Sequence, residues 1–125
     1  MFKFERIVED GVEKTFAKLS TALRNHKFVL LSYVDVQEIF KKNFEDPYKP
    51  FFIMEVCNPM AARELLYKDE DFGNFIPCKI VISEFNGKTK IRMPLVSDLS
   101  KGKVQGGQEI ASKYEKELMD IINSL

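Results

Sequence analysis

Residues 78–95 read CKIVISEFNGKTKIRMPL, and this stretch decides the fold. Two runs of strand length, CKIVISEF and KTKIRMPL, flank Asn86-Gly87, a dipeptide typical of a two-residue hairpin turn. The two strands joined by such a turn are antiparallel. The sequence therefore predicts a sheet that is at least partly antiparallel.

The residues around this hairpin predict further strands and helices. Strands are expected near residues 2–9, 27–36 and 51–57. Helices are expected near residues 11–26, 58–73 and 109–125, with a short helix possible at 36–44. The first helix has one apolar stripe, made by Val12, Phe16, Leu19 and Leu23. The predicted order is β-α-β-(α)-β-α-β-β-α.

Three local features lead to more detailed expectations. Residues 28–34, FVLLSYV, are apolar on both faces of a strand, which is typical of a central strand. The short helix is expected to turn Ile39, Phe40 and Phe44 inward. Residues 96–108, rich in glycine and lysine, are expected to form a loop, and Gly73 is expected to end the second long helix.

The element order favours an α+β fold over the alternatives. We predict a two-layer sandwich, in which a curved, mostly antiparallel β-sheet has its helices packed on one face. The 125 residues are the length of one domain, and residues 1–125 contain no repeat or linker. A chain of this length can bury one substantial core.

Composition argues against several classes of function. There are 19 Lys and Arg residues and 19 Asp and Glu residues, so the chain lacks the net basic charge of a dedicated nucleic-acid-binding protein. No apolar run approaches the ~18 residues of a membrane span. The charged N-terminal stretch lacks the apolar core of a signal peptide. We therefore expect a cytoplasmic protein, in which the two cysteines are free thiols.

The two cysteines mark the predicted functional site. Cys57 ends a strand directly before Asn58-Pro59, where a helix is expected to begin. The free N–H groups of a first helical turn stabilise a thiolate, so the pKa of Cys57 is expected to fall below ~8.5. Cys78 begins the next strand, and the two thiols are expected to face each other. Glu55 shares the strand face of Cys57 and is a further candidate.

Several interpretations of these residues stay open. The cysteines can be small buried apolar residues, a redox or sulfur-carrying pair, or metal ligands. They lack the close spacing and the nearby histidines of a zinc site, so no metal and no cofactor are predicted. The candidate ligand-binding or redox residues are Cys57, Cys78, Asn58 and Glu55.

Phenylalanine is frequent, with 11 residues and no tryptophan. These side chains can fill the core, or they can line an uncovered sheet face that serves as a dimer interface or a pocket for an apolar ligand. The residues considered for that face are Phe51, Phe52, Phe72, Phe75 and Phe85, with Met54 and Met93.

A resemblance to a known family rests on several of these motifs. They are Val56-Cys57-Asn58-Pro59, then Ala62, Leu65, Leu66 and Gly73, then Ile76-Pro77-Cys78 and VISEFNGK. With them the chain resembles, over nearly its whole length, the bacterial and archaeal "domain of unknown function 302" family. The resemblance implies a small α/β domain with a TATA-binding-protein-like sheet that is often a dimer. It implies no established activity.

The sequence favours a binding role over catalysis. It contains no G-x-S-x-G, no H-E-x-x-H and no phosphate-binding loop, although paired-carboxylate chemistry stays open. The leading hypothesis is a non-enzymatic homodimeric module that binds a small apolar ligand or a protein partner. The alternative is a thiol-based redox or sulfur-carrier protein that uses Cys57, with Cys78 as its resolving partner.

Overall fold

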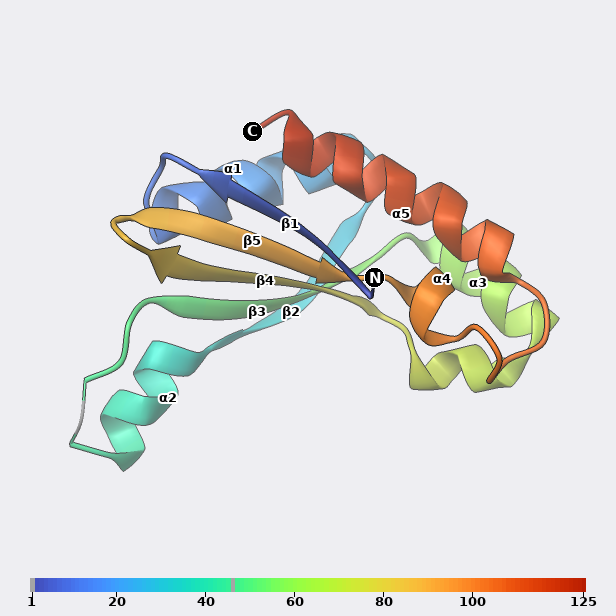
Figure 1. Ribbon diagram of the computed structural model, residues 1–125, viewed down its shortest axis with the longest axis horizontal. Coiled ribbons are helices and arrows are strands. Elements are labelled where there is room, and N and C mark those ends of the chain that lie inside the picture. The colour runs from blue at the N-terminus through green and yellow to red at the C-terminus, as the bar shows by residue number, and fades with distance from the viewer. Residues whose placement is uncertain (1, 46) are drawn as a thin grey trace.

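The computed structural model describes residues 2–45 and 47–125, which form one five-stranded antiparallel sheet with helices against it (Figure 1). The order across the sheet is β1-β5-β4-β3-β2, and each neighbouring pair is antiparallel. The predicted α+β sandwich is confirmed. The strands are β1 (Lys3–Val8), β2 (Val29–Asp35), β3 (Phe51–Cys57), β4 (Cys78–Phe85) and β5 (Lys88–Pro94).

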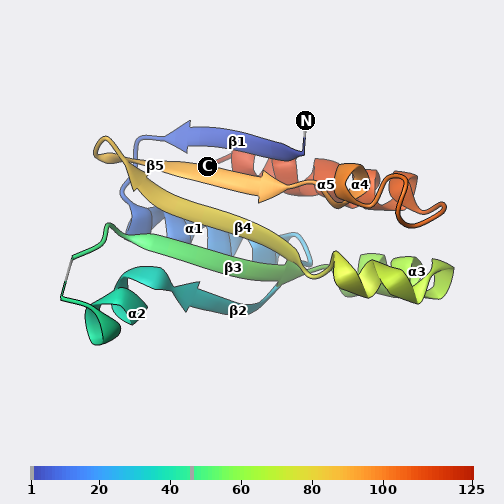
Figure 2. The same ribbon diagram turned by 60° about the horizontal axis from the view of Figure 1, so that its bottom comes forward.

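The helices occupy three places around the sheet. The long helices α1 (Val12–Asn25) and α5 (Gln108–Asn123) cover one face of it (Figure 1). Three short elements lie beyond one end of the strands (Figure 2): α3 (Pro59–Lys68), the 3₁₀ helix η1 (Glu70–Asn74) and α4 (Val96–Leu99). Helix α2 (Val36–Asn43) projects at the other end. No helix in the described residues is long and apolar enough to cross a membrane.

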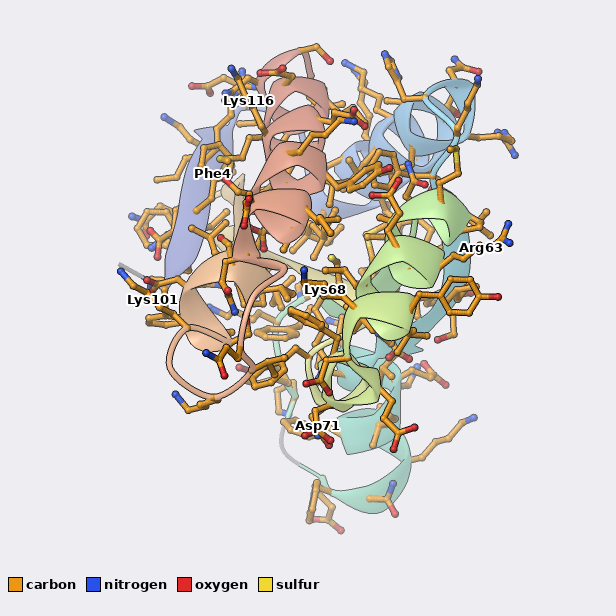
Figure 3. All side chains as sticks on the ribbon, turned by 90° about the vertical axis from the view of Figure 1, so that its right-hand side faces the viewer. Phe4, Arg63, Lys68, Asp71, Lys101 and Lys116 are labelled. Atoms are coloured by element: carbon orange, nitrogen blue, oxygen red, sulfur yellow. The ribbon has the colours of Figure 1, made fainter. Side chains whose placement is uncertain are left out.

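The buried side chains form two clusters. The larger one lies between the sheet and helices α1 and α5. The strands contribute fully buried Met54, Val56, Ile80, Ile82, Ile91 and Met93 to it. The smaller cluster lies beyond the strand ends and is made by Leu65, Phe72, Val96, Val104 and Ala111. Figure 3 looks onto this end of the molecule, where Lys68 of α3 points toward the loop that leads into α5.

Two local signals in the sequence are confirmed. At the hairpin, Asn86 and Gly87 both have positive φ, 51° and 80°, as a type I′ turn requires. At the start of α3, Asn58 Oδ1 accepts hydrogen bonds from the N–H groups of Met60 (3.0 Å) and Ala61 (3.3 Å). Pro59 occupies the first helical position, where its missing N–H costs nothing.

Strand β2 is at the edge of the sheet, so the prediction of a central strand is wrong. Apolar residues on both faces of a strand normally mean burial on both sides, but here most of β2 is exposed to solvent. The short helix α2 also departs from expectation. Of the three residues expected to point inward, Ile39 is 44% exposed and Phe44 is 62% exposed, because α2 extends away from the core.

Two smaller expectations are corrected as well, and one open alternative is decided. Helix α3 ends at Lys68, and Gly73 lies within the 3₁₀ helix η1 that follows. The segment 96–108 is not all loop, because α4 forms at its start. The aromatic residues and methionines considered for either the core or the uncovered sheet face divide between the two, and Phe51 and Phe85 lie on the uncovered face. The remaining residues pack in the two clusters: Phe52, Met54 and Met93 in the larger one, Phe72 and Phe75 in the smaller one.

Candidate functional site

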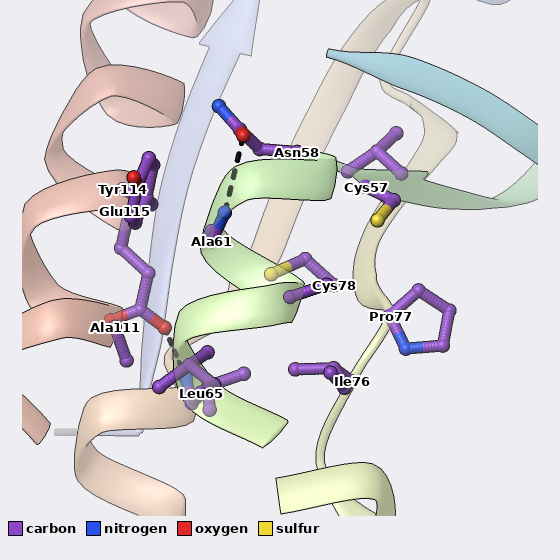
Figure 4. Close-up of a pocket in the computed structure, with 13 residues that line it drawn as sticks. Cys57, Asn58, Ala61, Leu65, Ile76, Pro77, Cys78, Ala111, Tyr114 and Glu115 are labelled. Carbon is purple, nitrogen blue, oxygen red and sulfur yellow. Dashed lines mark hydrogen bonds between the residues drawn. The ribbon is translucent and has the colours of Figure 1, made fainter. Parts of the chain in front are cut away.

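A small pocket lies where strands β3 and β4 reach α3 and α5 (Figure 4). Its cavity volume is about 30 Å³, which is room for one or two water-sized groups. Three alanines from the two helices, Ala61, Ala62 and Ala111, line it and leave this space between them. The other lining residues are mostly apolar, with a few polar groups among them.

The structure brings the two predicted cysteines to this pocket. Both are free and half-buried, and both lie beside α3 (Figure 4). Cys78 is opposite Val56 in the β3–β4 register, and Cys57 is the next residue along β3. Successive residues of a strand point to opposite faces, but β3 ends here and turns into α3. Both thiols therefore reach one pocket although they start on different sheet faces.

The environment of the thiols differs from the prediction. Burial raises the pKa of Cys57, so the expected lowering is wrong. Burial, with smaller contributions from Glu115 and Cys57, raises the pKa of Cys78 to about 12. The N–H groups of Met60 and Ala61 in the first turn of α3 donate to Asn58 Oδ1 and not to Cys57. Near neutral pH both thiols are protonated.

The other two predicted residues have different positions. Asn58 lines the pocket, and its side-chain oxygen caps α3. Glu55 lies on the uncovered face of the sheet, where Glu55 Oε1 accepts a hydrogen bond of 2.8 Å from the Ser32 hydroxyl. It does not line the pocket, so the structure separates Glu55 from Cys78 and Asn58.

Glu115 on α5 is a pocket residue that the sequence interpretation missed. It is 2% exposed, and it accepts hydrogen bonds from the backbone N–H groups of Val96 and Ser97 and from the Ser97 hydroxyl (2.6 Å). Burial raises the pKa of Glu115, while these hydrogen bonds partly oppose the shift. The available signal was its spacing, four residues after Ala111 and three before Leu118, on the buried stripe of the helix.

Tyr114 connects the two helices at the rim of the pocket. Its hydroxyl donates to Glu64 Oε1 of α3 over 3.3 Å. Desolvation and the neighbouring Glu64 carboxylate raise the pKa of Tyr114, so the phenol stays protonated and keeps its donor role. The contact holds the exposed sides of α3 and α5 together over the pocket.

The chemistry of this pocket suits the binding of a small apolar group. The oxygen atoms of its polar residues are largely engaged in hydrogen bonds within the protein. Glu115 accepts from the Val96 N–H of α4, the Asn58 side chain accepts from the first turn of α3, and the Tyr114 hydroxyl donates to Glu64. The thiols are weak hydrogen-bond donors at neutral pH. Within residues 2–45 and 47–125, no group of three or more His, Cys, Asp or Glu side chains is arranged to hold a metal ion.

Comparisons with known proteins agree with this fold. A solved structure, the uncharacterized conserved protein DUF302 from Bacillus stearothermophilus, superposes with a TM-score of 0.90 at 34% sequence identity. The alignment covers 98% of this chain and 97% of that one. No curated protein matches the sequence. The model of the family described as "Domain of unknown function DUF302" matches residues 4–125, and the chain belongs to this family.

Proposed function

We propose that the chain is a non-enzymatic binding module that works as a homodimer and holds a small, mostly apolar ligand in the pocket between α3 and α5. The observation that carries this proposal is the pocket itself, in which apolar walls surround a few polar groups from several elements. The protonated state of both thiols favours binding over nucleophilic chemistry. The two free cysteines suit a reducing compartment such as the cytoplasm.

The pocket dimensions restrict the ligand. A cavity of about 30 Å³ takes one or two methyl-sized groups when α3 and α5 are placed as described. A larger ligand therefore inserts only an apolar end, or it displaces α3. An anionic end is disfavoured inside, because the buried Glu115 carboxylate and the apolar lining leave no counter-charge for an anion.

The experiment is an NMR titration with short primary alcohols, which present a small apolar end. We expect saturable amide shifts confined to α3, to the start of β4 and to the first turns of α5. Ala62→Leu fills the pocket mouth and should abolish these shifts. Ala17→Leu makes the same change on α1, away from the pocket, and should leave them unchanged. Shifts that never saturate, or that persist in Ala62→Leu, would refute the ligand-binding proposal.

The alternative function, a thiol redox or sulfur-carrier role, is favoured by one observation: Cys57 and Cys78 line the same pocket. Their raised pKa values weigh against it, because the thiolate is the reactive form. Iodoacetamide labelling of reduced protein at several pH values, resolved by cysteine, tests it. An apparent pKa for Cys57 well below ~8.5 would favour thiol chemistry over the binding proposal.

A further inference from the structure

We propose that the uncovered face of the sheet binds single-stranded nucleic acid. Cations of β4 and β5 on this face hold phosphate groups, and a row of aromatic rings that runs from β3 to α2 stacks with bases. The inference goes beyond the proposed function, because this face lies on the other side of the sheet from α1 and α5, and its cations and rings do not line the pocket. Figure 2 shows the face turned toward the viewer.

The charged side chains on the uncovered face are mostly cations. The register of the sheet places five cations there, namely Lys3, Lys79, Lys88, Lys90 and Arg92. The carboxylates that the described strands place on the same face are Glu5 and Glu55. The chain as a whole has 19 cationic and 19 anionic side chains. Net charge therefore argues against a nucleic-acid partner only for the chain as a whole, because the charge of this face is positive.

Three of these cations lack a counter-charge. In the described part of the chain, Lys79, Lys90 and Arg92 have no carboxylate within ion-pair distance. Lys90 lies over the Phe85 ring at 4.1 Å, and Arg92 donates to the Ser83 hydroxyl at 3.1 Å. These contacts keep both side chains on the sheet and leave most of their N–H groups available to another acceptor. Such cations on two neighbouring strands suit the phosphate groups of a polyanion.

A row of aromatic rings begins beside this cluster. Phe51 of β3 lies opposite Ser83 of β4 in the register. From Phe51 the ring contacts continue to Tyr48 (6.0 Å between centroids), then to Phe40 (4.9 Å) and to Phe44 (5.8 Å). Tyr48 is 38% exposed and Phe44 is 62% exposed. Exposed rings next to cations are the two features with which proteins bind single strands, because every base can stack on an aromatic ring.

Two other anionic partners fit this surface less well. Helix α2 extends from the sheet on the side opposite α1 and α5 (Figure 1), so it would hold a flat membrane surface away from Lys90 and Arg92. An acidic segment of another protein would pair with the cations, but its carboxylates have no use for the row of rings. A flexible single strand supplies both phosphate groups and planar bases.

The test is fluorescence anisotropy of a labelled oligodeoxythymidine of about 12 nucleotides, titrated with the full chain at several salt concentrations. We expect saturable binding that weakens as salt is added. Each phosphate neutralised on a single strand contributes about −0.7 to the slope of log K against log salt concentration. The three unpaired cations therefore predict a slope of about −2.

Two pairs of substitutions isolate the contribution of the cations. The double variant Lys90→Gln with Arg92→Gln should weaken binding by about tenfold or more at low salt and reduce the slope to about −0.7. The matched control is Lys113→Gln with Lys116→Gln, which removes the same charge from the exposed side of α5 (Figure 3). The control should change the dissociation constant by less than about twofold, because these positions lie on the other side of the sheet.

Two single variants complete the set. Phe51→Leu keeps an apolar side chain but removes the ring, and it should weaken binding by about fivefold or more. Lys79 is exposed, so Lys79→Gln should fold normally and weaken binding by about threefold. Circular dichroism checks the folding of every variant. If the double variant does not fold, Lys79→Gln decides the question, and unchanged binding in Lys79→Gln overturns the inference.

The remaining outcomes separate nucleic acid from other partners. Absence of saturable binding at low salt overturns the inference, and so does a double variant that binds as well as its control. Poly-L-glutamate at the same charge concentration should compete poorly, since it has no bases, and equal competition would identify a site for any polyanion instead. Vesicles of phosphatidylserine and phosphatidylcholine that bind while the oligonucleotide does not would assign the face to membranes. The pocket titration with primary alcohols is independent of all these results.

Discussion

Replacing Gly107 by alanine tests how tightly α5 is joined to the smaller cluster. Gly107 precedes α5 and has a φ of +84°, a conformation that side chains other than glycine rarely adopt. A Cβ atom at this position would lie 2.6 Å from Cε2 and 2.8 Å from Cζ of Phe72. Phe72 is 0% exposed, so its ring has no free space into which to move.

The expected destabilisation has two parts. The left-handed backbone costs an alanine about 1–2 kcal/mol. Overpacking against a buried ring costs about 1–3 kcal/mol more. Gly102 supplies a matched control, because its φ is +79° but no atom lies within 4 Å of the place that a Cβ atom would take there. Gly102→Ala should therefore show the backbone cost alone, and the difference between the variants isolates the contact with Phe72.

The assay is urea unfolding, monitored by far-ultraviolet circular dichroism. We expect the free energy of unfolding to fall by about 2–5 kcal/mol in Gly107→Ala and by about 1–2 kcal/mol in Gly102→Ala. The slope of the free energy of unfolding against urea concentration should be similar in both variants, since the surface exposed on unfolding hardly changes. Equal losses of stability in the two variants would show that the contact between residue 107 and Phe72 contributes nothing.

Three further predictions concern the pocket. Burial raises the pKa of Glu115, so its contribution to stability is fully present below the unfolded pKa of ~4.3 and is lost as pH rises through the folded pKa. Glu115→Gln should remove this pH dependence in urea titrations. It should also lower the free energy of unfolding by about 1–3 kcal/mol, because the N–H groups of Val96 and Ser97 lose one carboxylate oxygen as an acceptor. Asn58→Ala should lower the free energy of unfolding by about 1 kcal/mol, because it removes the cap of α3. Asn58→Asp should retain most of the stability that this cap contributes. Thermal unfolding of the two variants checks both expectations. The raised pKa of Cys78 predicts that stability falls as pH rises above ~8.5. The fall in stability should be smaller in Cys78→Ala than in the wild type. An equal fall in the two proteins would contradict the raised pKa of Cys78.

Elements specified by local chemistry were predictable from the sequence. Asn86-Gly87 meets the demand of a type I′ turn for positive φ at both positions, and Asn58-Pro59 supplies both a cap and a first helical residue. These signals do not depend on the rest of the fold. They were sufficient to establish the antiparallel sheet and the strand-to-helix junction at which the pocket lies.

Features that depend on distant parts of the chain were not predictable in this way. An apolar strand is equally compatible with the centre of a sheet and with an edge that another surface covers, so the pattern of β2 was misleading. Glu115 looked like one charge among several on α5, and its burial depends on the N–H groups of α4, about 18 residues earlier. The pKa of Cys57 is raised by burial, and that burial depends on how the distant parts of the chain pack around the end of β3.

The division of the buried side chains into two clusters has a consequence for how the molecule moves. Cys78 packs against both clusters, at the junction between the sheet and the short helices. Regions with separate sets of contacts can open with separate free energies. We expect the end that contains α3, η1 and α4 to unfold locally while the sheet stays intact, so that its amides exchange with solvent before those of β4 and β5. Such an opening would admit ligands much larger than the pocket between α3 and α5 holds when these helices are in place.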